Sequence, residues 1–456
     1  MSTSAAPETI AAIATAPGRA GVGIVRVSGT DIGRLIEGVV GCRPEARVAT
    51  LATFRNADGG PIDQGLALWF PAPASYTGES VLELQAHGSP VALSLLLARC
   101  LELGARLAEP GEFTRRAFLN GKLDLAQAES VADLIEAATA TAARAAARSL
   151  SGEFSREIHA LVDELTTLRM FTEATLDFPE EDVEFLDAGD ARGRLRGLRE
   201  RVATILARAV TGARLNAGLS VVLVGRPNVG KSSLMNRLVR EDAAIVTPIA
   251  GTTRDTVERP VSLGGFPLTV VDTAGLRDTD DAVERIGIER TWAAVARADV
   301  VIVIVDARDA SFTLPPEDAA ILARLPGDVP RLVVHNKADL VGIAPHVESF
   351  EGRRHVWLSA LTGHGLERLE EEVLALADVD AAGEDAFIAR ERHVAALREA
   401  SQHLEGATTH VETRPPAIEL FAEELRMAQS ALSRITGEFT ADDLLGVIFS
   451  RFCIGK

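Results

Sequence analysis

The segment from Gly225 to Ser232 (GRPNVGKS) has the spacing of a phosphate-binding loop, G-x-x-x-x-G-K-S. The glycines of such a loop let backbone N–H groups close around phosphate oxygens. Lys231 would reach the β- and γ-phosphates, and Ser232 would bind a magnesium ion. The nearly continuous apolar run Leu219–Val224 precedes the loop and predicts the strand, buried on both faces, that this motif requires. The residues predicted to bind nucleotide here are Asn228, Val229, Gly230, Lys231, Ser232 and Ser233.

A second motif, D-x-x-G, follows the next predicted buried strand, Leu268–Val271. Its Asp272 would lie in the second shell of the magnesium ion, and the amide of Gly275 would sense the γ-phosphate. Another apolar run, Val300–Val305, predicts a further strand of the same sheet. The members of the motif, Asp272, Thr273, Ala274 and Gly275, are therefore predicted to bind nucleotide.

A third motif, Asn336-Lys337-Ala338-Asp339, selects the base. A carboxylate accepts two parallel hydrogen bonds from the N1–H and 2-amino groups of guanine. Adenine lacks this donor pair, so Asp339 would be left unpaired with ATP. The backbone N–H groups of Ser359 and Ala360, after a strand-like HVWL run, could bind guanine O6. Motifs in this order at the ends of predicted strands indicate a doubly wound GTP-hydrolysing domain.

Two features concern hydrolysis. Leu276 follows the D-x-x-G motif, where many small GTPases carry the glutamine that orients the attacking water, so another group must do this work. Asn228 and the segment 247–255 (TPIAGTTRD) could hold a monovalent cation at the position that an arginine finger would occupy. Thr253 would then complete the magnesium shell.

Composition narrows the class of protein. The chain has 456 residues, a net charge of −18, and only three widely spaced cysteines, which fit neither a disulfide scaffold nor a metal cluster. We read no signal peptide, transit peptide or membrane span, and therefore expect a cytoplasmic protein. Seven carboxylates crowd Asp177–Asp190 without a basic residue. This segment is either a solvated acidic loop or an anionic surface for a basic partner.

Apolar periodicity divides the chain. Residues 1–120 mix short β-like runs with a helical stretch near Val91–Leu103, and apolar residues then recur at helical spacing from Leu150 to Leu168 and from Ile418 to Ile435. Gly437 is a plausible helix C-cap and Thr440 a plausible N-cap. The predicted fold is a multidomain α/β and α protein. It has an α+β N-terminal domain (1–120), a discontinuous helical domain (121–216 and 381–456) and an inserted doubly wound phosphate-loop G domain (217–380).

Lysine is rare in this chain. Only Lys122, Lys231, Lys337 and Lys456 occur among 47 basic side chains. A lysine in an arginine-rich chain hints at a site that needs a compact ammonium rather than a planar fork. Two of the four fall inside nucleotide motifs, which favours a functional role for Lys122 and Lys456. The structural alternative is a helix-entry residue and a frayed terminal residue.

The chain resembles the MnmE (TrmE) family of tRNA-modification GTPases over essentially its whole length. The motifs that carry the resemblance are APGRAGVGIVRVSG, GEFTRRAFLNGKLDLAQAE, GRPNVGKS, GTTRD, DTAGLR, VERIGIER, NKAD and the most specific of them, FCIGK at 452–456. The resemblance implies a homodimer formed through the N-terminal domain and a potassium-stimulated GTPase that also binds magnesium. It also implies a 5-formyl- or methylene-tetrahydrofolate-type cofactor. It further implies a flavin-dependent partner of the MnmG type, with which the chain would form a heterotetramer. The reaction that it implies modifies C5 of the wobble uridine of certain tRNAs.

The resemblance also implies roles for residues. Seven residues match the family's loop that closes on the nucleotide, and they are expected to bind it: Thr247, Pro248, Ile249, Ala250, Gly251, Thr252 and Thr253. Those matching the potassium shell are Asn228, Thr247, Ile249 and Thr252, and those matching the magnesium ligands are Ser232 and Thr253. Glu284 matches the residue that positions the attacking water. The folate contacts are matched by Arg26, Glu83, Lys122 and Lys456, with Cys453 near the one-carbon unit as a catalytic or packing residue. Without the family, Glu284 reads as a surface helix carboxylate and Glu83 as a salt-bridged strand residue.

Two other classes of protein share some of these motifs. A ribosome-assembly GTPase resembling Era or Der would carry an RNA-binding module with a basic face or a second G domain, and neither is visible in the sequence. A membrane-remodelling or transport-linked GTPase would need a spanning or amphipathic basic segment.

Overall fold

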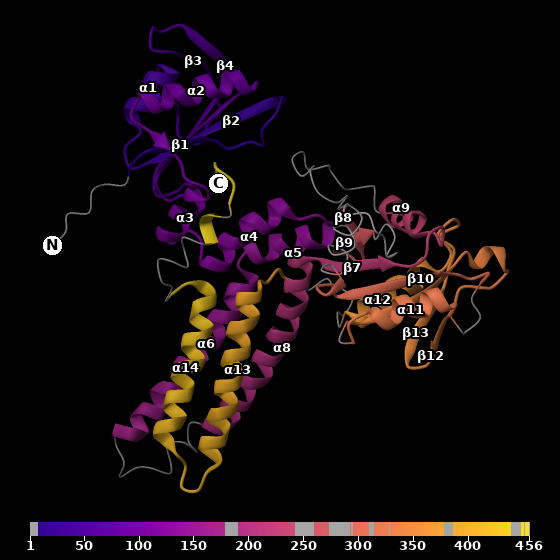
Figure 1. Cartoon of the computed structure of the whole chain (residues 1–456). Coiled ribbons are helices and arrows are strands. Elements are labelled where there is room, and N and C mark those ends of the chain that lie inside the picture. Colours follow the sequence, from indigo (N-terminus) through magenta and orange to yellow (C-terminus); the bar gives the residue numbers. More distant parts are fainter. Residues whose placement is uncertain are drawn as a thin grey trace. The chain divides into compact units, whose positions relative to one another are not determined.

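A computed structural model describes residues 8–177, 190–241, 260–272, 292, 295–309, 314–327, 329–377, 386–438, 448–450 and 452–455. The chain forms two compact units, whose helices and strands are labelled in Figure 1. Unit 1 joins residues 1–132 to 432–456, and unit 2 holds residues 133–431. The predicted domain boundaries at 120, 216 and 380 stay a prediction. No helix in the described ranges has the length and apolar composition needed to cross a membrane.

Unit 1 is built on a six-stranded sheet in the order β3-β4-β5-β2-β1-β6, antiparallel except for the parallel pair β1–β6. Its strands are β1 (Ile10–Ile13), β2 (Ala20–Gly29), β3 (Thr50–Arg55), β4 (Pro61–Phe70), β5 (Ser80–Gly88) and β6 (Arg106–Leu107). Its helices are α1 (Gly33–Val40), α2 (Pro90–Glu102), α3 (Glu112–Leu119) and the start of α4 (Leu125–Glu136). The predicted helix near Val91–Leu103 is confirmed, whereas α1 and α3, each only eight residues long, were missed.

One face of this sheet is the core of unit 1. Alternate residues of the strands, among them Val25, Phe54 and Leu84, are fully buried against α1 and α2. The opposite set of alternate residues, which includes Arg26 and Glu83, therefore lies on the face away from these two helices.

The C-terminal segment packs within unit 1. Phe449 and Phe452 are buried with Leu125 of α4. The Gly111 amide donates a hydrogen bond to the Cys453 carbonyl at 3.3 Å. Gly455 has a φ of +100°, and a Cβ there would collide with the Ile13 carbonyl of β1. Only glycine permits this close approach of the tail to the sheet.

Unit 2 contains a seven-stranded sheet in the order β12-β13-β11-β10-β7-β9-β8, parallel at its centre and antiparallel at both edges. Its strands are β7 (Leu219–Val224), β8 (Pro260–Leu263), β9 (Phe266–Asp272), β10 (Val300–Asp306), β11 (Arg331–Asn336), β12 (Val347–Phe350) and β13 (Arg353–Trp357). Its helical elements are α9 (Lys231–Glu241), α11 (Pro316–Arg324), the 3-10 turn η2 (Ala338–Leu340) and α12 (Leu366–Leu376). The predicted central strands are confirmed, and the edge strands β8 and β12 were missed.

The central strands are buried on both faces. In β10, Ile302 and Ile304 pack with residues of α9 and α12, while Val301 and Val303 pack with residues of α11. Apolar side chains at every position are therefore required, which explains the continuous apolar runs. The carboxyl ends of these strands share one edge of the sheet, where the motifs lie.

The remaining helices of unit 2 are α5 (Ala140–Leu150), α6 (Glu153–Asp177), α8 (Ala191–Ala217), α13 (Glu391–Glu412) and most of α14 (Ile418–Thr436). The apolar stripe predicted as one helix from Leu150 is in fact two helices, because the chain turns at Gly152. Gly437 follows α14 with a φ of +88°, which confirms the predicted C-cap, and Thr440 lies outside the described residues.

Candidate functional site

The phosphate-binding loop connects β7 to α9, as its motif requires. Gly230 has a φ of +102°, and a Cβ there would collide with the Asn336 side-chain nitrogen. Asn228 adopts a left-handed conformation with a φ of +61°, which turns the loop sharply. The loop is therefore a tight cradle for which these residue types are needed, and it fits a phosphate ligand.

Lys231 begins α9 and is nearly buried. Its Nζ donates hydrogen bonds to the carbonyl oxygens of Gly225, at 2.7 Å, and Arg226, at 3.0 Å. The ammonium group thus lies over the loop that would hold the phosphates. Ser232 and Ser233 follow it in the first turn of α9, where backbone N–H groups and the helix dipole favour an anion.

The base-recognition motif is tied to this loop through side chains. The Asn336 Nδ2 donates to the Val229 carbonyl at 2.8 Å, and its Oδ1 accepts from the Ala360 amide at 2.9 Å. Lys337 Nζ donates to the Asn228 carbonyl at 2.7 Å. Three segments distant in sequence are thereby fixed at one edge of the sheet.

Asp339 lies in η2 with an exposed side chain. No hydrogen bond or ion pair of the described structure engages its carboxylate, so both oxygens are available to a donor pair. The amides of Ser359 and Ala360 are both used within the chain, by the His364 carbonyl and by Asn336. The next amide, that of Leu361, has no hydrogen-bond partner among the described residues and is the better candidate for guanine O6.

Asp306, at the end of β10, was missed by the sequence motifs. It is almost completely buried, and its Oδ2 accepts a hydrogen bond from Lys337 Nζ at 2.7 Å. Arg308 also donates to both carboxylate oxygens, at 3.0 and 2.8 Å. Hydrogen bonds from Arg308 and then Lys337 outweigh burial and hold the pKa of the Asp306 carboxyl well below its usual range. A carboxylate directly after the apolar run Val300–Val305 was the sequence signal that could have identified it.

A cluster of stacked rings lies on β11 and β13, the strands that lead into the base-recognition segments. His335, the residue before Asn336 in β11, is fully buried, and its Nε2 lies 2.9 Å from Nδ1 of His355. Its ring stacks on Trp357 at 4.2 Å between centroids. Burial lowers the pKa of His335 to about 3, with a further contribution from His355, so the ring stays neutral at physiological pH.

Several predicted site residues lie outside the described residues: Thr247, Pro248, Ile249, Ala250, Gly251, Thr252, Thr253, Thr273, Ala274, Gly275, Glu284 and Lys456. Asp272 ends β9 beside the phosphate-loop strand, and only its backbone is described. The roles assigned to these residues stay predictions.

A second group of predicted residues meets in unit 1. Arg26 and Glu83 lie opposite each other on β2 and β5, and Arg26 Nε donates to Glu83 Oε1 at 2.9 Å. The Arg26 guanidinium also lies 5.5 Å from the ring centre of Tyr76 and 5.8 Å from that of Phe113. The salt-bridge reading of Glu83 is thus correct, yet its Oε2 has no partner among the described residues. The Arg26–Glu83 pair, with Tyr76 and Phe113 beside it, could therefore bind a flat, polar ring.

Lys122, three residues after the end of α3, contacts the segment between β4 and β5. Its Nζ donates to the Pro73 carbonyl at 3.3 Å, in the β4–β5 segment that also carries Tyr76. Cys453 is exposed, and the next residue, Ile454, forms a β-bridge with Pro110. The described part of the tail therefore lies against the segment that leads into α3.

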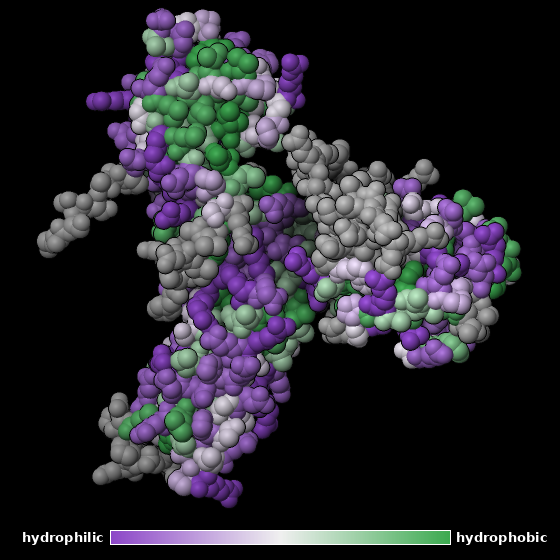
Figure 2. All heavy atoms as spheres, in the orientation of Figure 1, coloured by the Kyte–Doolittle hydropathy of each residue, from purple (hydrophilic) through white to green (hydrophobic). Residues whose placement is uncertain are grey.

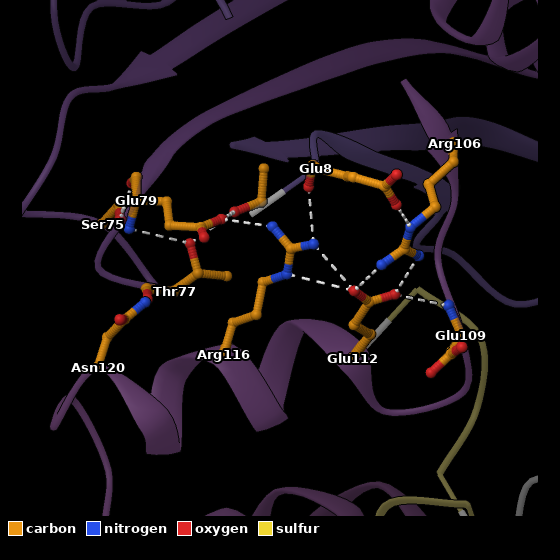
Figure 3. A network of polar contacts seen from close by, with 10 residues as sticks. Glu8, Ser75, Thr77, Glu79, Arg106, Glu109, Glu112, Arg116 and Asn120 are labelled. Carbon is orange, nitrogen blue, oxygen red and sulfur yellow. Dashed lines mark hydrogen bonds and ion pairs between the residues drawn. The ribbon is translucent and has the colours of Figure 1, made fainter. Parts of the chain in front are cut away.

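A buried ionic network holds this region together (Figure 3). Arg116 donates to Glu79 at 2.8 Å, to Glu112 at 2.9 Å and to the Glu8 carbonyl at 2.8 Å. Arg106 forms a two-point contact with Glu112, at 2.8 and 2.7 Å. Burial would raise the pKa of Glu112, but hydrogen bonds from Arg106, the Glu109 amide and Arg116 hold it at about 2. The network fixes α3 and the β4–β5 segment to the sheet that carries Arg26.

Comparisons with known proteins match the whole chain. A family model described as "GTP-binding protein TrmE N-terminus" matches residues 9–122, and one described as "MnmE helical domain" matches residues 125–453. The tRNA modification GTPase MnmE of Azoarcus sp. (strain BH72) is 60% identical over 450 residues, 99% of this chain and 98% of that protein. Its counterpart in Ralstonia nicotianae is 59% identical over 456 residues, 98% of this chain and 96% of that protein. Among solved structures, an Aquifex aeolicus Era bound to GDP.AlF4- is 26% identical, covers 41% of this chain and 66% of that chain, and has a TM-score of 0.28.

Proposed function

Because the chain belongs to the MnmE family of tRNA modification GTPases, we propose that it modifies C5 of the wobble uridine of certain tRNAs. It is an enzyme that hydrolyses GTP to GDP and phosphate. The modification uses a folate-borne one-carbon unit and a flavin-dependent partner of the MnmG type, in a cytoplasmic heterotetramer. The alternative of an Era- or Der-like ribosome-assembly GTPase lacks support, since the full-length relatives above carry a different name.

One observation carries the nucleotide site. Asn336 joins the phosphate loop to the segment after β13, and Lys337 joins the same loop to Asp306. Hydrogen bonds of the chain itself thus hold together the groups that would bind phosphate and base, which lowers the ordering cost of binding. Asp339, exposed and unengaged among the described residues, supplies the acceptor pair that selects guanine.

Lys231 and the first turn of α9 provide positive charge for the phosphates. The Lys231 ammonium would exchange its two carbonyl partners for phosphate oxygens, and the α9 amides would orient the γ-phosphate. Magnesium held by Ser232 and Thr253 would neutralise phosphate charge, and potassium held by Asn228 with Thr247, Ile249 and Thr252 would add a positive charge where an arginine finger acts. The hydrogen bond from Lys337 to the Asn228 carbonyl fixes the backbone from which the Asn228 side chain would reach the ion.

Glu284 is proposed to position the attacking water. We expect Glu284→Ala to lower kcat strongly with nucleotide affinity nearly unchanged, because such a group acts mainly in the transition state. Single-turnover hydrolysis and GTP affinity, measured in parallel, check this role. Wild-type turnover in the variant would remove Glu284 from the mechanism.

The Arg26–Glu83 pair is proposed as the centre of the folate site. The unpartnered Oε2 of Glu83 would accept the donor pair of the pterin ring, while the Tyr76 and Phe113 rings flank the guanidinium. Lys122 and Lys456 would contact the ligand's carboxylates, and Cys453 would lie near the one-carbon unit. The folate supplies that one-carbon unit when bound, and the residues named here hold and orient it.

Unit 1 is proposed to form the homodimer contact. Leu51, 69% exposed, lies directly opposite Leu66 on β3 and β4, on the face away from α1 and α2. Figure 2 shows a further apolar patch on this unit. On helix α2, Val91 and Leu95 are 70% and 55% exposed. Large apolar side chains that are this exposed are typical of a protein–protein interface, which here would be covered by a second copy of the chain.

A strain that lacks the gene tests the function directly. Nucleoside analysis of its tRNA should show the wobble uridine without the C5 group, and expression of the wild-type chain should restore it. An Asp339→Asn chain, which no longer selects GTP, should fail to restore it. Normal wobble modification in the deletion strain, together with accumulated ribosome precursors, would instead support the ribosome-assembly class.

A further inference from the structure

Among the described helices of unit 2, α8 carries the most arginines. Its 27 residues include seven arginines, and Glu200 is its only carboxylate. The helices that pack on it, α6 and α13, each carry more carboxylates than arginines. In a chain with a net charge of −18, this is a concentrated positive surface that needs an explanation.

Arginines on the side of α8 that faces α6 are neutralised. Arg194 pairs with Glu164 at 3.0 Å, and Arg208 pairs with Glu157 at 2.7 Å. These ion pairs join two helices of the bundle and account for the charge on that side. They have a structural role, and the paired charges attract a charged partner only weakly.

The side that faces α13 is different. Arg192, Arg196 and Arg199, which we call the arginine row, are exposed and spaced four and three residues apart, so they lie on one flank of α8. Arg199 Nη1 donates to the hydroxyl of Thr408 at 3.3 Å, and Arg192 Nη2 donates to the Val411 carbonyl at 3.3 Å.

The Thr408 hydroxyl is neutral, so it orients the Arg199 guanidinium without cancelling its charge. Within the described ranges, no carboxylate lies within ion-pair distance of Arg196 or Arg199. The exposed Glu405 and Glu412 of α13 form no ion pair with the row in these ranges either. In the part of the chain that the structure describes, Arg196 and Arg199 therefore have no carboxylate partner, and their charge is available to a ligand.

We propose that the arginine row binds the phosphodiester backbone of the tRNA, an inference that rests on the proposed function. The row spans about 10 Å along the helix at 1.5 Å per residue, a length over which more than one phosphate can be met. Guanidinium groups match phosphate oxygens in a two-point geometry. An acidic protein needs such a localised basic face to hold a polyanion, and backbone contacts of this kind position RNA without reading its sequence.

The test compares two double variants of the full chain that remove equal charge from the same helix. R196Q/R199Q shortens the row, whereas R194Q/R201Q removes two arginines outside it. Binding of an unmodified tRNA transcript is measured by fluorescence anisotropy between 50 and 200 mM KCl. GTP hydrolysis and thermal unfolding of each variant serve as folding controls.

We expect R196Q/R199Q to lose up to about 60-fold in affinity near 0.1 M salt, and its log–log salt slope to fall by about 1.4 to 1.8, for two lost phosphate contacts. R194Q/R201Q should stay close to the wild type, and R196K/R199K should recover most of the slope. GTP hydrolysis without tRNA should be the same in all variants.

The proposal would be overturned by wild-type tRNA affinity in R196Q/R199Q, by equal loss in both Gln variants, or by intact tRNA binding with lost association with the flavin-dependent partner. Absence of tRNA binding by the wild-type chain at low salt would also overturn it. Restoration of wobble modification in the deletion strain is scored separately. A wild-type chain that restores modification while the row proves dispensable leaves the proposed function standing.

Discussion

Asp306→Asn tests whether the nucleotide site is organised through Lys337. The carboxylate is buried and bonds Lys337 Nζ at 2.7 Å, and the same ammonium bonds the Asn228 carbonyl at 2.7 Å. A hydrogen bond to a charged group stabilises by about 1.5–3 kcal/mol and a neutral one by about 0.5–1.5 kcal/mol. The amide should therefore weaken the Lys337 contact by about 1–1.5 kcal/mol, which corresponds to roughly tenfold weaker GTP and GDP binding if this contact preorganises the site.

A double-mutant cycle measures the coupling. The dissociation constants of GDP and GTP are determined by calorimetry for the wild type, Asp306→Asn, Lys337→Gln and the double variant. If Asp306 acts through Lys337, then Asp306→Asn should change affinity less than about twofold in the Lys337→Gln background, because the contact is already lost. Additive effects of the two substitutions would refute this reasoning.

Arg308→Gln is the matched control. Arg308 bonds the same carboxylate, but its side chain is more than half exposed, and among the described residues it forms no hydrogen bond with the phosphate loop. We expect little change in nucleotide affinity, since solvent screens such a contact. A loss equal to that of Asp306→Asn would show that the charge balance at Asp306, and not its contact with Lys337, governs binding.

The other predictions concern base choice, cation, tail and acid stability. Asp339→Asn should shift preference from GTP toward xanthosine triphosphate in competition binding, and equal binding of both by the wild type would contradict the assignment. Hydrolysis should be faster in potassium than in sodium at equal ionic strength, and Asn228→Ala should erase the difference; a wild type indifferent to the cation argues against a potassium site. Deletion of residues 452–456 should abolish tRNA modification and weaken folate binding with GTP hydrolysis largely intact, and early loss of GTPase activity would disprove this account of the tail. Since the pKa of Glu112 is about 2 when folded and 4.5 unfolded, its stabilisation is complete above pH 4.5 and lost as pH falls toward 2; unfolding free energy in Glu112→Gln should depend less on pH across this window than in the wild type.

The sequence alone determined the nucleotide chemistry and most of the sheet around it. A phosphate loop works through local backbone geometry, so the residues at fixed spacing predict both the turn at Gly230 and the positions of Lys231 and Ser232. The central strands were predicted because burial on both faces demands continuous apolar runs, which periodicity reveals. Edge strands such as β12, half exposed and short, carry no such signal.

Only the tertiary structure decided which side chains meet. Asp306 finds Lys337 because β10 and β11 are neighbours, and Arg26 finds Glu83 because β2 pairs with β5 in that register. Sheet order and register result from the packing of the whole core and cannot be read from spacing between residues far apart in sequence. The same holds for α8, whose arginines look alike in the sequence. Packing against α6 pairs Arg194 with a carboxylate, whereas packing against α13 leaves Arg199 bonded to a hydroxyl, with its charge facing outward.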